Sequence, residues 1–380
     1  MANKKISELT SAAPLTGAEL LPLVQGGETL KTTAQDIADL GGGLFEEGTG
    51  LRSIQPSTVG GNNYASGENS TVSGGFYNYA TEYNSTVGGG AFNTAANYAT
   101  IAGGEDSIAS GEYSSIGGGE SNEATGNYST VGGGAFNIAS DYSSTISGGK
   151  ENNTSGEFAT VGCGYENSAS GKFSTISGGY QNDASGYGAV IAGGGYWNEN
   201  ESYNEATGEY FPTVGGGSGN YATYSFATVS GGYSNDATGY ASTISGGYSN
   251  DASSTYSTVS GGASNNASGY ESTIGGGRRN IASGYKSTIG GGAYNGASGS
   301  YSNILGGLGN TASSDYSSIL GGQSNTTSTF VNSHIVGSNI TSDRNDTTFV
   351  ENLSIKTIPT SAAGLPSGSV WSNGGVLNIV

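Results

Sequence analysis

Residues 240–269 read YASTISGGYSNDASS TYSTVSGGASNNASG, which are two consecutive units of one 15-residue pattern. In both units Ser-Thr precedes a β-branched aliphatic residue, Ile244 or Val259, and Gly-Gly follows after one further residue. A fixed period is the mark of a repeat architecture. A unit of this length is too short for a helix pair or a propeller blade, but it suits one coil with two short strands and two turns. The pattern therefore predicts an all-β chain folded as a parallel β-solenoid.

The aliphatic residue after Ser-Thr, called the anchor below, recurs along most of the chain. Most successive anchors are 15 residues apart; the exceptions are intervals of 13 after Val59, 14 after Val87 and 23 after Ile191. Because stacked coils rise by about 4.8 Å each, the eighteen anchors predict a rod on the order of 85 Å long. The anchors are Val59, Val72, Val87, Ile101, Ile116, Val131, Ile146, Val161, Ile176, Ile191, Val214, Val229, Ile244, Val259, Ile274, Ile289, Ile304 and Ile319.

The other recurring positions each have a physical role. A β-branched anchor suits a strand, and the Gly-Gly after it permits a tight corner. The sixth residue after the anchor is usually Asn, and stacked coils would align these side chains into a ladder of hydrogen-bonded amides. A small residue two positions later, such as Ala80, leaves room for a close neighbour, and the Gly at the tenth position, such as Gly126, closes a second corner. The asparagines are Asn78, Asn93, Asn122, Asn137, Asn152, Asn167, Asn182, Asn220, Asn235, Asn250, Asn265, Asn280, Asn295, Asn310 and Asn325.

The composition of the 380-residue chain disfavours the common alternatives. Gly supplies 71 residues, charged residues are 11% and hydrophobic residues 33%, which is too little for a conventional core. Collagen is excluded because Gly does not recur at every third residue. The 25 Tyr and 10 Phe argue against disorder. The single cysteine, Cys163, forms no intrachain disulfide, and its position in the repeat predicts a small buried residue.

The formal net charge is −19, with only 11 Lys and Arg residues. Such a surface repels phosphate backbones and anionic membranes, so we expect no nucleic-acid partner. No stretch approaches the roughly 20 apolar residues of a membrane span, and residues 1–20 lack the apolar run of a secretory signal. We therefore expect no membrane insertion, and synthesis in the cytosol without export by the usual secretory route.

A lone coil is poor in buried apolar surface, which bears on the oligomeric state. One aliphatic side chain and one alanine, at about 25 cal/mol per Å2, barely offset about 1–2 kcal/mol of backbone entropy per residue. We therefore expect a homotrimer in which the anchor or alanine ladder of each chain lies on a shared axis. The alternative is a monomeric solenoid held by backbone ladders and tyrosine stacking.

The unit S-T-[VI]-G-G-G…N-x-A-S-G, found across residues 57–325, resembles the head repeats of trimeric autotransporter adhesins, the YadA-like repeats. The resemblance implies a left-handed parallel β-roll with three chains side by side. The residues alone leave the handedness open. Those adhesins require a secretion signal and a membrane-anchoring C-terminal segment, and we expect neither in this chain.

The N-terminal segment differs from the repeats. Leu20–Gln25 and Glu28–Thr33 flank Gly26-Gly27, which predicts a hairpin, and the segment Thr33-Ala-Gln-Asp36 predicts a short helix over Ala34–Leu40. The run KKISELT…PLTGAELLPLVQGGETLKTTAQDIADL, within residues 4–40, resembles the N-terminal attachment segment of bacteriophage tail fibres and related virion proteins. The resemblance implies that residues 1–45 bind other virion proteins. It also implies a location in the virion, with assembly in the host cytoplasm and release by lysis.

The C-terminal run IPTSAAGLPSGSVWSNGGVLNIV resembles the terminal tail of phage structural proteins. Its last eleven residues predict a hairpin that turns at Asn373-Gly374, with Trp371 as a packing residue of a cap. A cap protects the open sheet edge of a solenoid from aggregation. We therefore predict three regions: an attachment segment over residues 1–47, a solenoid over residues 48–330 with an inserted loop at 195–212, and a capping segment over residues 331–380.

The long interval after Ile191 predicts that loop on the side of the solenoid. It combines aromatic residues with carboxylates, which suits stacking on sugar faces with hydrogen bonds to hydroxyls. The alternative is that its aromatics pack against the solenoid or a neighbouring subunit. The basic residues Arg278, Arg279 and Lys286 fit either an anionic glycan or an ordinary solvated patch. The candidate receptor contacts are Tyr196, Trp197, Glu199, Glu201, Tyr203, Tyr210, Phe211, Arg278 and Arg279.

Catalysis finds little support in the residue types. The one histidine, His334, lies where Ile335 or Val336 replaces the regular anchor, and no nucleophile, histidine and acid set can be assembled. The GGYSND runs faintly resemble calcium-binding repeats, but their spacing differs from the nonapeptide pattern. The single regular threonine column, in units such as that of Thr243, is too little for an ice-binding surface. We therefore expect no enzymatic activity, no cofactor and no metal site.

These observations predict a homotrimeric phage tail fibre, a structural protein that attaches the virion to a host-surface glycan or protein. Weak contacts would be multiplied by three chains and several fibres, so that avidity exceeds single-site affinity. One alternative is a head fibre or a capsid or tail decoration protein without a receptor. The others are a bacterial trimeric adhesin and a glycan depolymerase tailspike.

Overall fold

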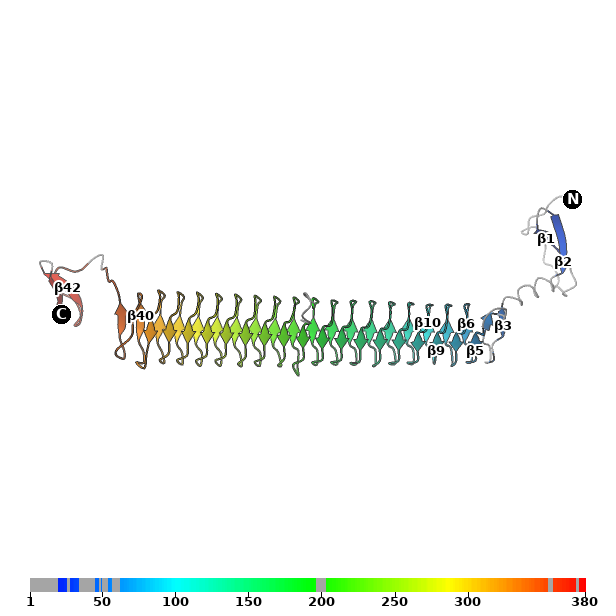
Figure 1. Ribbon diagram of the computed structural model, residues 1–380, viewed down its shortest axis with the longest axis horizontal. Coiled ribbons are helices and arrows are strands. Elements are labelled where there is room, and N and C mark those ends of the chain that lie inside the picture. The colour runs from blue at the N-terminus through cyan, green and yellow to red at the C-terminus, as the bar shows by residue number, and fades with distance from the viewer. Residues whose placement is uncertain are drawn as a thin grey trace. The chain divides into compact units, whose positions relative to one another are not determined.

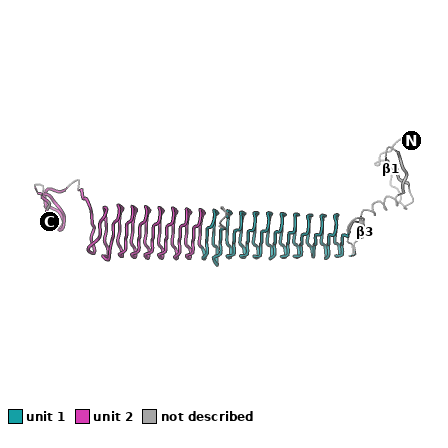
Figure 2. The backbone as a smooth tube through the Cα atoms, viewed as in Figure 1, with its two compact units in different colours: residues 1–226 teal, residues 227–380 magenta. Residues whose placement is uncertain are grey.

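The computed structural model describes residues 20–25, 28–33, 45–47, 49, 54–56, 62–195, 203–354, 358–373 and 376–380. These residues form strands and turns without a helix, and the strands stack as the coils of a parallel β-solenoid (Figure 1). The chain divides into two compact units, Met1–Phe226 and Ala227–Val380 (Figure 2). The fold class predicted from the repeat is confirmed. The helix expected over Ala34–Leu40 and the anchor expected at Val59 lie outside the described residues.

In the first unit each coil contributes one strand to an anchor sheet and one to an alanine sheet. Neighbouring coils pair in parallel with identical positions aligned, as in Thr71↔Thr86 and Val72↔Val87. The anchor sheet comprises β6 (Thr71–Val72), β8 (Thr86–Val87), β10 (Thr100–Ile101), β12 (Ser115–Ile116), β14 (Thr130–Val131), β16 (Thr145–Ile146), β18 (Thr160–Val161), β20 (Thr175–Ile176), β22 (Val190–Ile191) and β24 (Thr213–Val214). The alanine sheet comprises β5 (Tyr64–Ala65), β7 (Tyr79–Ala80), β9 (Thr94–Ala95), β11 (Ile108–Ala109), β13 (Glu123–Ala124), β15 (Ile138–Ala139), β17 (Asn153–Thr154), β19 (Ser168–Ala169), β21 (Asp183–Ala184), β23 (Glu205–Ala206) and β25 (Tyr221–Ala222).

The second unit repeats this arrangement. Its anchor sheet comprises β26 (Thr228–Val229), β28 (Thr243–Ile244), β30 (Thr258–Val259), β32 (Thr273–Ile274), β34 (Thr288–Ile289), β36 (Asn303–Ile304), β38 (Ser318–Ile319), β40 (His334–Val336) and β41 (Thr348–Val350). Its alanine sheet comprises β27 (Asp236–Ala237), β29 (Asp251–Ala252), β31 (Asn266–Ala267), β33 (Ile281–Ala282), β35 (Gly296–Ala297), β37 (Thr311–Ala312) and β39 (Thr326–Thr327). The parallel ladder therefore continues through β40 and β41, beyond residue 330.

Three antiparallel hairpins complete the described strands. Strands β1 (Leu20–Gln25) and β2 (Glu28–Thr33) pair as the sequence predicts, with Gln25 opposite Glu28. Strands β3 (Phe45–Glu47) and β4 (Ile54–Pro56) form a hairpin whose second strand joins the anchor sheet, because Ile54 pairs with Thr71. Strands β42 (Val370–Asn373) and β43 (Val376–Ile379) pair with Asn373 opposite Val376, so Asn373 belongs to the first strand and not to the turn, which was predicted at Asn373-Gly374.

The core of most coils is one anchor and one alanine facing each other, and in two coils buried Thr154 and Thr327 replace the alanine. The anchors from Val72 to Ile319 and the alanines of the alanine sheet are at most 1% exposed within a single chain. The expectation that sister chains meet through the anchor or alanine ladder is therefore wrong. Both ladders point into the chain's own coil, and any association between chains must use another surface. Where the repeat degenerates, Ile335 is the buried anchor and Val336 points outward.

The predicted asparagine ladder is confirmed in each of the two units. The side-chain oxygen of Asn250 accepts hydrogen bonds of 3.1 Å from both the backbone NH and the side-chain amide of Asn265. The Asn265 amide also donates to the carbonyl oxygens of Gly261 and Gly277, each at 3.0 Å. The side chain thus links three successive coils inside the protein, where an unpaired polar group is costly. Ser107 replaces asparagine in one coil, and its hydroxyl still accepts from the backbone NH of Asn122 at 3.3 Å.

Two turns connect the strands of each coil and lie at its opposite edges (Figure 1). The glycine corner spans the first to the sixth residue after the anchor, and the aromatic corner joins the alanine strand to the next anchor strand. At the glycine corner the third residue after the anchor is closed by the next coil: a Cβ added to Gly75, at φ +80°, would lie 1.9 Å from the Gly90 carbonyl oxygen. The second residue faces open space, as at Gly74, which has no neighbouring atom within 4 Å of an added Cβ. Cys163 occupies this second position and is exposed, so the expectation of a buried cysteine is wrong.

Candidate binding surfaces of the solenoid

A continuous column of aromatic rings runs along the aromatic corner of each unit. In the first unit the members are Tyr83, Tyr98, Tyr113, Tyr128, Tyr142, Phe158, Phe173, Tyr187, Phe211 and Phe226. In the second unit they are Tyr240, Tyr256, Tyr270, Tyr285, Tyr301 and Tyr316. Successive rings either stack, as Tyr98 and Tyr113 do with centroids 4.6 Å apart, or meet edge to face. Where one ring lies flat on the next, their faces are covered and chiefly ring edges remain for a ligand, so these columns stabilise the corner more readily than they bind sugar faces.

The structure divides the predicted 195–212 segment into two parts. Tyr196, Trp197, Glu199 and Glu201 lie outside the described residues. From Tyr203 the chain follows the ordinary coil: Asn204 joins the asparagine ladder, with its amide 3.1 Å from the Asn182 side-chain oxygen. Glu205 then pairs with Asp183 in the alanine sheet.

Tyr210 and Phe211 belong to the aromatic corner. Phe211 stacks on Phe226 with ring centroids 6.0 Å apart and meets Tyr187 edge to face at 5.5 Å. Tyr210 forms a β-bridge with Tyr187, and hydrogen bonding to Glu209 raises the pKa of the Tyr210 hydroxyl. The alternative in which these aromatics pack against the solenoid therefore describes Tyr210 and Phe211. Tyr210 and Phe211 thus lie together beside Tyr187, whereas Tyr203 directly precedes the ladder residue Asn204.

Arg278 and Arg279 converge on one tyrosine of the next coil at the glycine corner. The guanidinium groups of Arg278 and Arg279 donate to the Tyr294 hydroxyl oxygen at 2.9 and 3.0 Å. Both also lie over the Tyr294 ring, 5.7 and 5.5 Å from its centroid. The hydrogen bond from Arg279, together with the positive charge of both groups, lowers the pKa of the Tyr294 hydroxyl. The sequence singled out the two arginines but missed Tyr294, although it lies at the arginine position one unit later.

Lys286 is separate from this pair. It lies at the aromatic corner, where its ammonium group forms a 2.9 Å ion pair with Glu271 and lies 5.3 Å from the ring centroid of Tyr285. The grouping of Lys286 with the two arginines is therefore wrong, because their positions in the repeat place them at opposite corners of the coil.

Aspartates line the outward side of the alanine sheet. Asp236 and Asp251 are paired in neighbouring strands, and one carboxylate oxygen of each is buried without a hydrogen-bond partner. Burial raises the pKa of both carboxyl groups, and the charge of Asp251 raises the pKa of Asp236 further. Burial also raises the pKa of Asp183, in the first unit.

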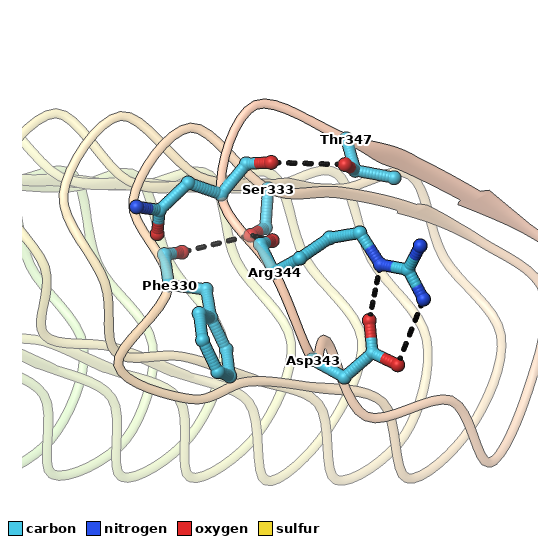
Figure 3. A network of polar contacts seen from close by, with 6 residues as sticks. Phe330, Ser333, Asp343, Arg344 and Thr347 are labelled. Atoms are coloured by element: carbon cyan, nitrogen blue, oxygen red, sulfur yellow. Dashed lines mark hydrogen bonds and ion pairs between the residues drawn. The ribbon is translucent and has the colours of Figure 1, made fainter.

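The single histidine lies at the end of the second unit's ladder. The Nε2 atom of His334 is 3.1 Å from the side-chain oxygen of Asn332. The neighbouring turn is closed by Ser333, whose hydroxyl donates to the carbonyl oxygens of Phe330 and Arg344 at 2.8 and 3.1 Å (Figure 3). Arg344 in turn forms an ion pair with Asp343 (Figure 3). These contacts tie one turn to the next and place His334 beside the Asn332 amide.

Within the described ranges no group of three or more His, Cys, Asp or Glu side chains is arranged to hold a metal ion. The same residues include no helix long and apolar enough to cross a membrane.

One known family matches part of the chain. The family model of the ubiquitous surface protein adhesin repeat matches residues 174–186. This stretch is a single unit, from the Ser before the anchor strand to the Gly of the aromatic corner, and it includes the ladder residue Asn182. No curated protein matches the chain. The matched unit has the same strands and corners as its neighbours, so the chain is a β-solenoid repeat protein with an adhesin-like unit.

Proposed function

We propose that this protein is a trimeric virion fibre that attaches a phage to the surface of its host, and that it acts by binding and not by catalysis. The observation that carries the proposal is the β-solenoid formed by the coils of each compact unit, of which one coil, at residues 174–186, matches an adhesin repeat. Each coil buries its own core, so the outward positions are free to vary without loss of the fold. A scaffold of this kind presents many weakly binding sites, and avidity then supplies the affinity.

The hairpin β1–β2 supports the virion part of the proposal. It lies within the segment whose sequence resembles the attachment segments of tail fibres, and it pairs in the register that the sequence predicts. The same segment would serve a head fibre or a decoration protein, which needs no receptor.

Self-association is supported by the charge pattern on the outward side of the anchor sheet. From Thr71 to Leu320 the residues just before and just after each anchor are mainly Thr, Ser and Gly, and none is charged. The alanine sheet and both corners carry acidic side chains, for example Asp236, Glu120 and Glu271. Chains with a formal charge of −19 each repel one another, so an uncharged side is the favourable surface for contact between copies. We propose that this side, called the threonine face, mediates trimer formation.

A bacterial surface adhesin is the second candidate, and the match at residues 174–186 is the observation that favours it. Immunodetection separates the two proposals. A virion fibre is recovered with purified phage particles, whereas an adhesin is recovered with the outer surface of producing cells. Absence from purified particles would remove the virion proposal.

The inserted loop offers a direct test of attachment. Deletion of residues 197–203 restores the standard six-residue interval between the anchor Ile191 and the ladder residue Asn204. We expect the shortened chain to fold, because each coil then has the standard connection at its glycine corner. If the loop contacts the receptor, phage adsorption falls at least tenfold, with unchanged thermal unfolding of the purified fibre. Unaltered adsorption would assign the contact to another surface.

A further inference from the structure

Arg278 and Arg279 differ from the other basic side chains that the structure describes. Lys150, Lys172, Lys286 and Arg344 each form an ion pair with a carboxylate of the same chain. For the two arginines the described contacts are with Tyr294, a neutral hydroxyl and ring. Two guanidinium groups of like charge thus share one oxygen atom without a counter-charge. A bound anion would stabilise this pair more than it would stabilise a cation that already has a carboxylate partner.

The surroundings of the pair lack negative charge. In the second unit the glycine corners from Ser230 to Asn325 contain no Asp or Glu. The same corner of the first unit carries Glu105, Asp106, Glu120, Glu151 and Glu166. The flanking coils place Ala263 and Ala293 beside Arg278 in the bridge column of this corner, so both neighbours of Arg278 within that column are small. An anion that approaches this corner of the otherwise acidic chain therefore meets two cations and no carboxylate.

The same corner also offers tyrosine surface. Tyr248 precedes Ala263 in the bridge column and is 55% exposed, and its ring stacks on Tyr233 on the side of the preceding coil. The next coil carries only the methyl group of Ala263 at this position. A pyranose ring suits an exposed tyrosine, and an acidic substituent on the sugar suits the guanidinium fork. Nucleic acid is disfavoured, because a long polyanion would also meet the acidic surfaces of the same chain.

We infer that Arg278 and Arg279, held by Tyr294, form a binding site for the carboxylate groups of an acidic polysaccharide such as a uronic-acid polymer. The site deepens the proposed attachment function and rests on it. Tyr294 is a positioning residue, because its hydroxyl accepts from both guanidinium groups and fixes them side by side. Each copy in an oligomer supplies one such site, so a polymer with many carboxylates binds more tightly than a short fragment.

Calorimetric titration of the full chain with a galacturonic-acid oligosaccharide tests the site. The matched ligand is the same oligosaccharide with its carboxyl groups methyl-esterified, and inorganic sulfate reports simple anion binding. We expect saturable binding of the free acid that weakens with added salt, little binding of the ester, and far weaker binding of sulfate. Equal binding of acid and ester, or no binding of the acid by the wild-type chain, would overturn the inference.

The variants localise the effect. Arg278→Ala with Arg279→Ala is expected to weaken binding at least tenfold, whereas Arg278→Lys with Arg279→Lys keeps the charge but loses the fork and gives an intermediate affinity. Lys286→Ala, which removes a paired cation at the opposite corner, is the control and leaves affinity unchanged. If Lys286→Ala weakened binding of the oligosaccharide as much as the double alanine variant does, net charge alone would explain the affinity, and the proposed site would be wrong. Because the titration uses the isolated protein, its outcome is independent of whether the fibre occurs in virions.

Discussion

At the scale of single residues, the asparagine ladder explains how a chain so poor in large apolar side chains holds its coils in register. The side-chain oxygen of Asn265 accepts two hydrogen bonds from Asn280. The two N–H bonds of its amide face three acceptors, one in the preceding coil, one in its own and one in the next, at 3.0–3.1 Å. A side chain that satisfies its hydrogen-bonding groups inside the protein gains the bond energies without the cost of an unpaired buried dipole. The ladder therefore works as a second core made of polar atoms.

Replacing Asn265 by Ala is expected to destabilise the second unit. The change removes the partner of the Gly261 carbonyl oxygen and of the Asn280 backbone NH, whereas the Gly277 carbonyl oxygen keeps its hydrogen bond from the Ala263 backbone NH. Each buried unpaired group costs about 1–3 kcal/mol. We expect a loss of about 3 kcal/mol or more, measured as a lower urea midpoint. Asn265→Ser is the matched control, because Ser107 occupies the ladder position in one coil of the first unit. We expect this variant to lose less stability than Asn265→Ala. Equal effects of Ala and Ser would contradict a hydrogen-bonding role.

At the scale of the element, the coil was largely predictable because its period fixes every position at once. The anchors from Val72 onward, the ladder asparagines and the β1–β2 hairpin follow from spacing and residue type, and the structure confirms them. The direction in which a small side chain faces was not predictable. Cys163 at the second position after the anchor is exposed, since that position bulges outward, while the third position is closed by the next coil.

The candidate site was less predictable, because a 23-residue interval does not reveal which of its residues are the extra ones. The run Asn204-Glu205-Ala206 was the available signal, because it has the asparagine and the alanine at the spacing of the repeat. It marks where the regular coil resumes after the extra residues. Tyr210 and Phe211 then fall at the aromatic corner. Tyr294 was missed because contact between neighbouring coils joins residues that are 15 or 16 positions apart.

The paired aspartates of the alanine sheet give the fold a dependence on pH. Burial raises the pKa of Asp236 and Asp251 in the folded chain, so protons bind more tightly to the folded than to the unfolded state. The resulting stabilisation is complete below the unfolded pKa of about 3.9 and is lost as the pH rises through the raised folded pKa. We therefore expect the double variant Asp236→Asn, Asp251→Asn to have a higher urea midpoint than wild type at pH 7, and the same midpoint near pH 3.

Asparagine is a suitable substitute, because Asn266 occupies the same position in the next coil. The control is Glu120→Gln at an exposed glycine corner of the first unit, which removes one negative charge without relieving burial. If Glu120→Gln raised the urea midpoint at pH 7 as much as the double variant does, net charge would explain the stabilisation. A difference from wild type that persists at pH 3 would contradict the role of ionisation.

At the scale of the whole molecule, the proposed trimer depends on the threonine face, because the anchors and alanines are already buried in each chain. Thr258→Glu places a carboxylate on the half-buried outward side of β30 without touching the core. We expect sedimentation equilibrium to give three times the 37.7 kDa chain mass for wild type and a lower mass for this variant. Asn266→Glu on the alanine sheet is the control, since Glu123 and Glu205 occupy that position naturally, and it should remain trimeric. A wild-type chain that sediments as a monomer would contradict the proposal.

The near identity of the coils has an evolutionary consequence. The run GGYSNDA occurs at residues 231–237 and again at 246–252, so an exchange between two such runs keeps the 15-residue phase of the coils. A gain or loss of 45 nucleotides inserts or removes one complete coil, and the asparagines and anchors on either side meet again in phase. A single such event therefore changes the length of the solenoid by one whole coil. Natural variants should differ in length by multiples of fifteen residues.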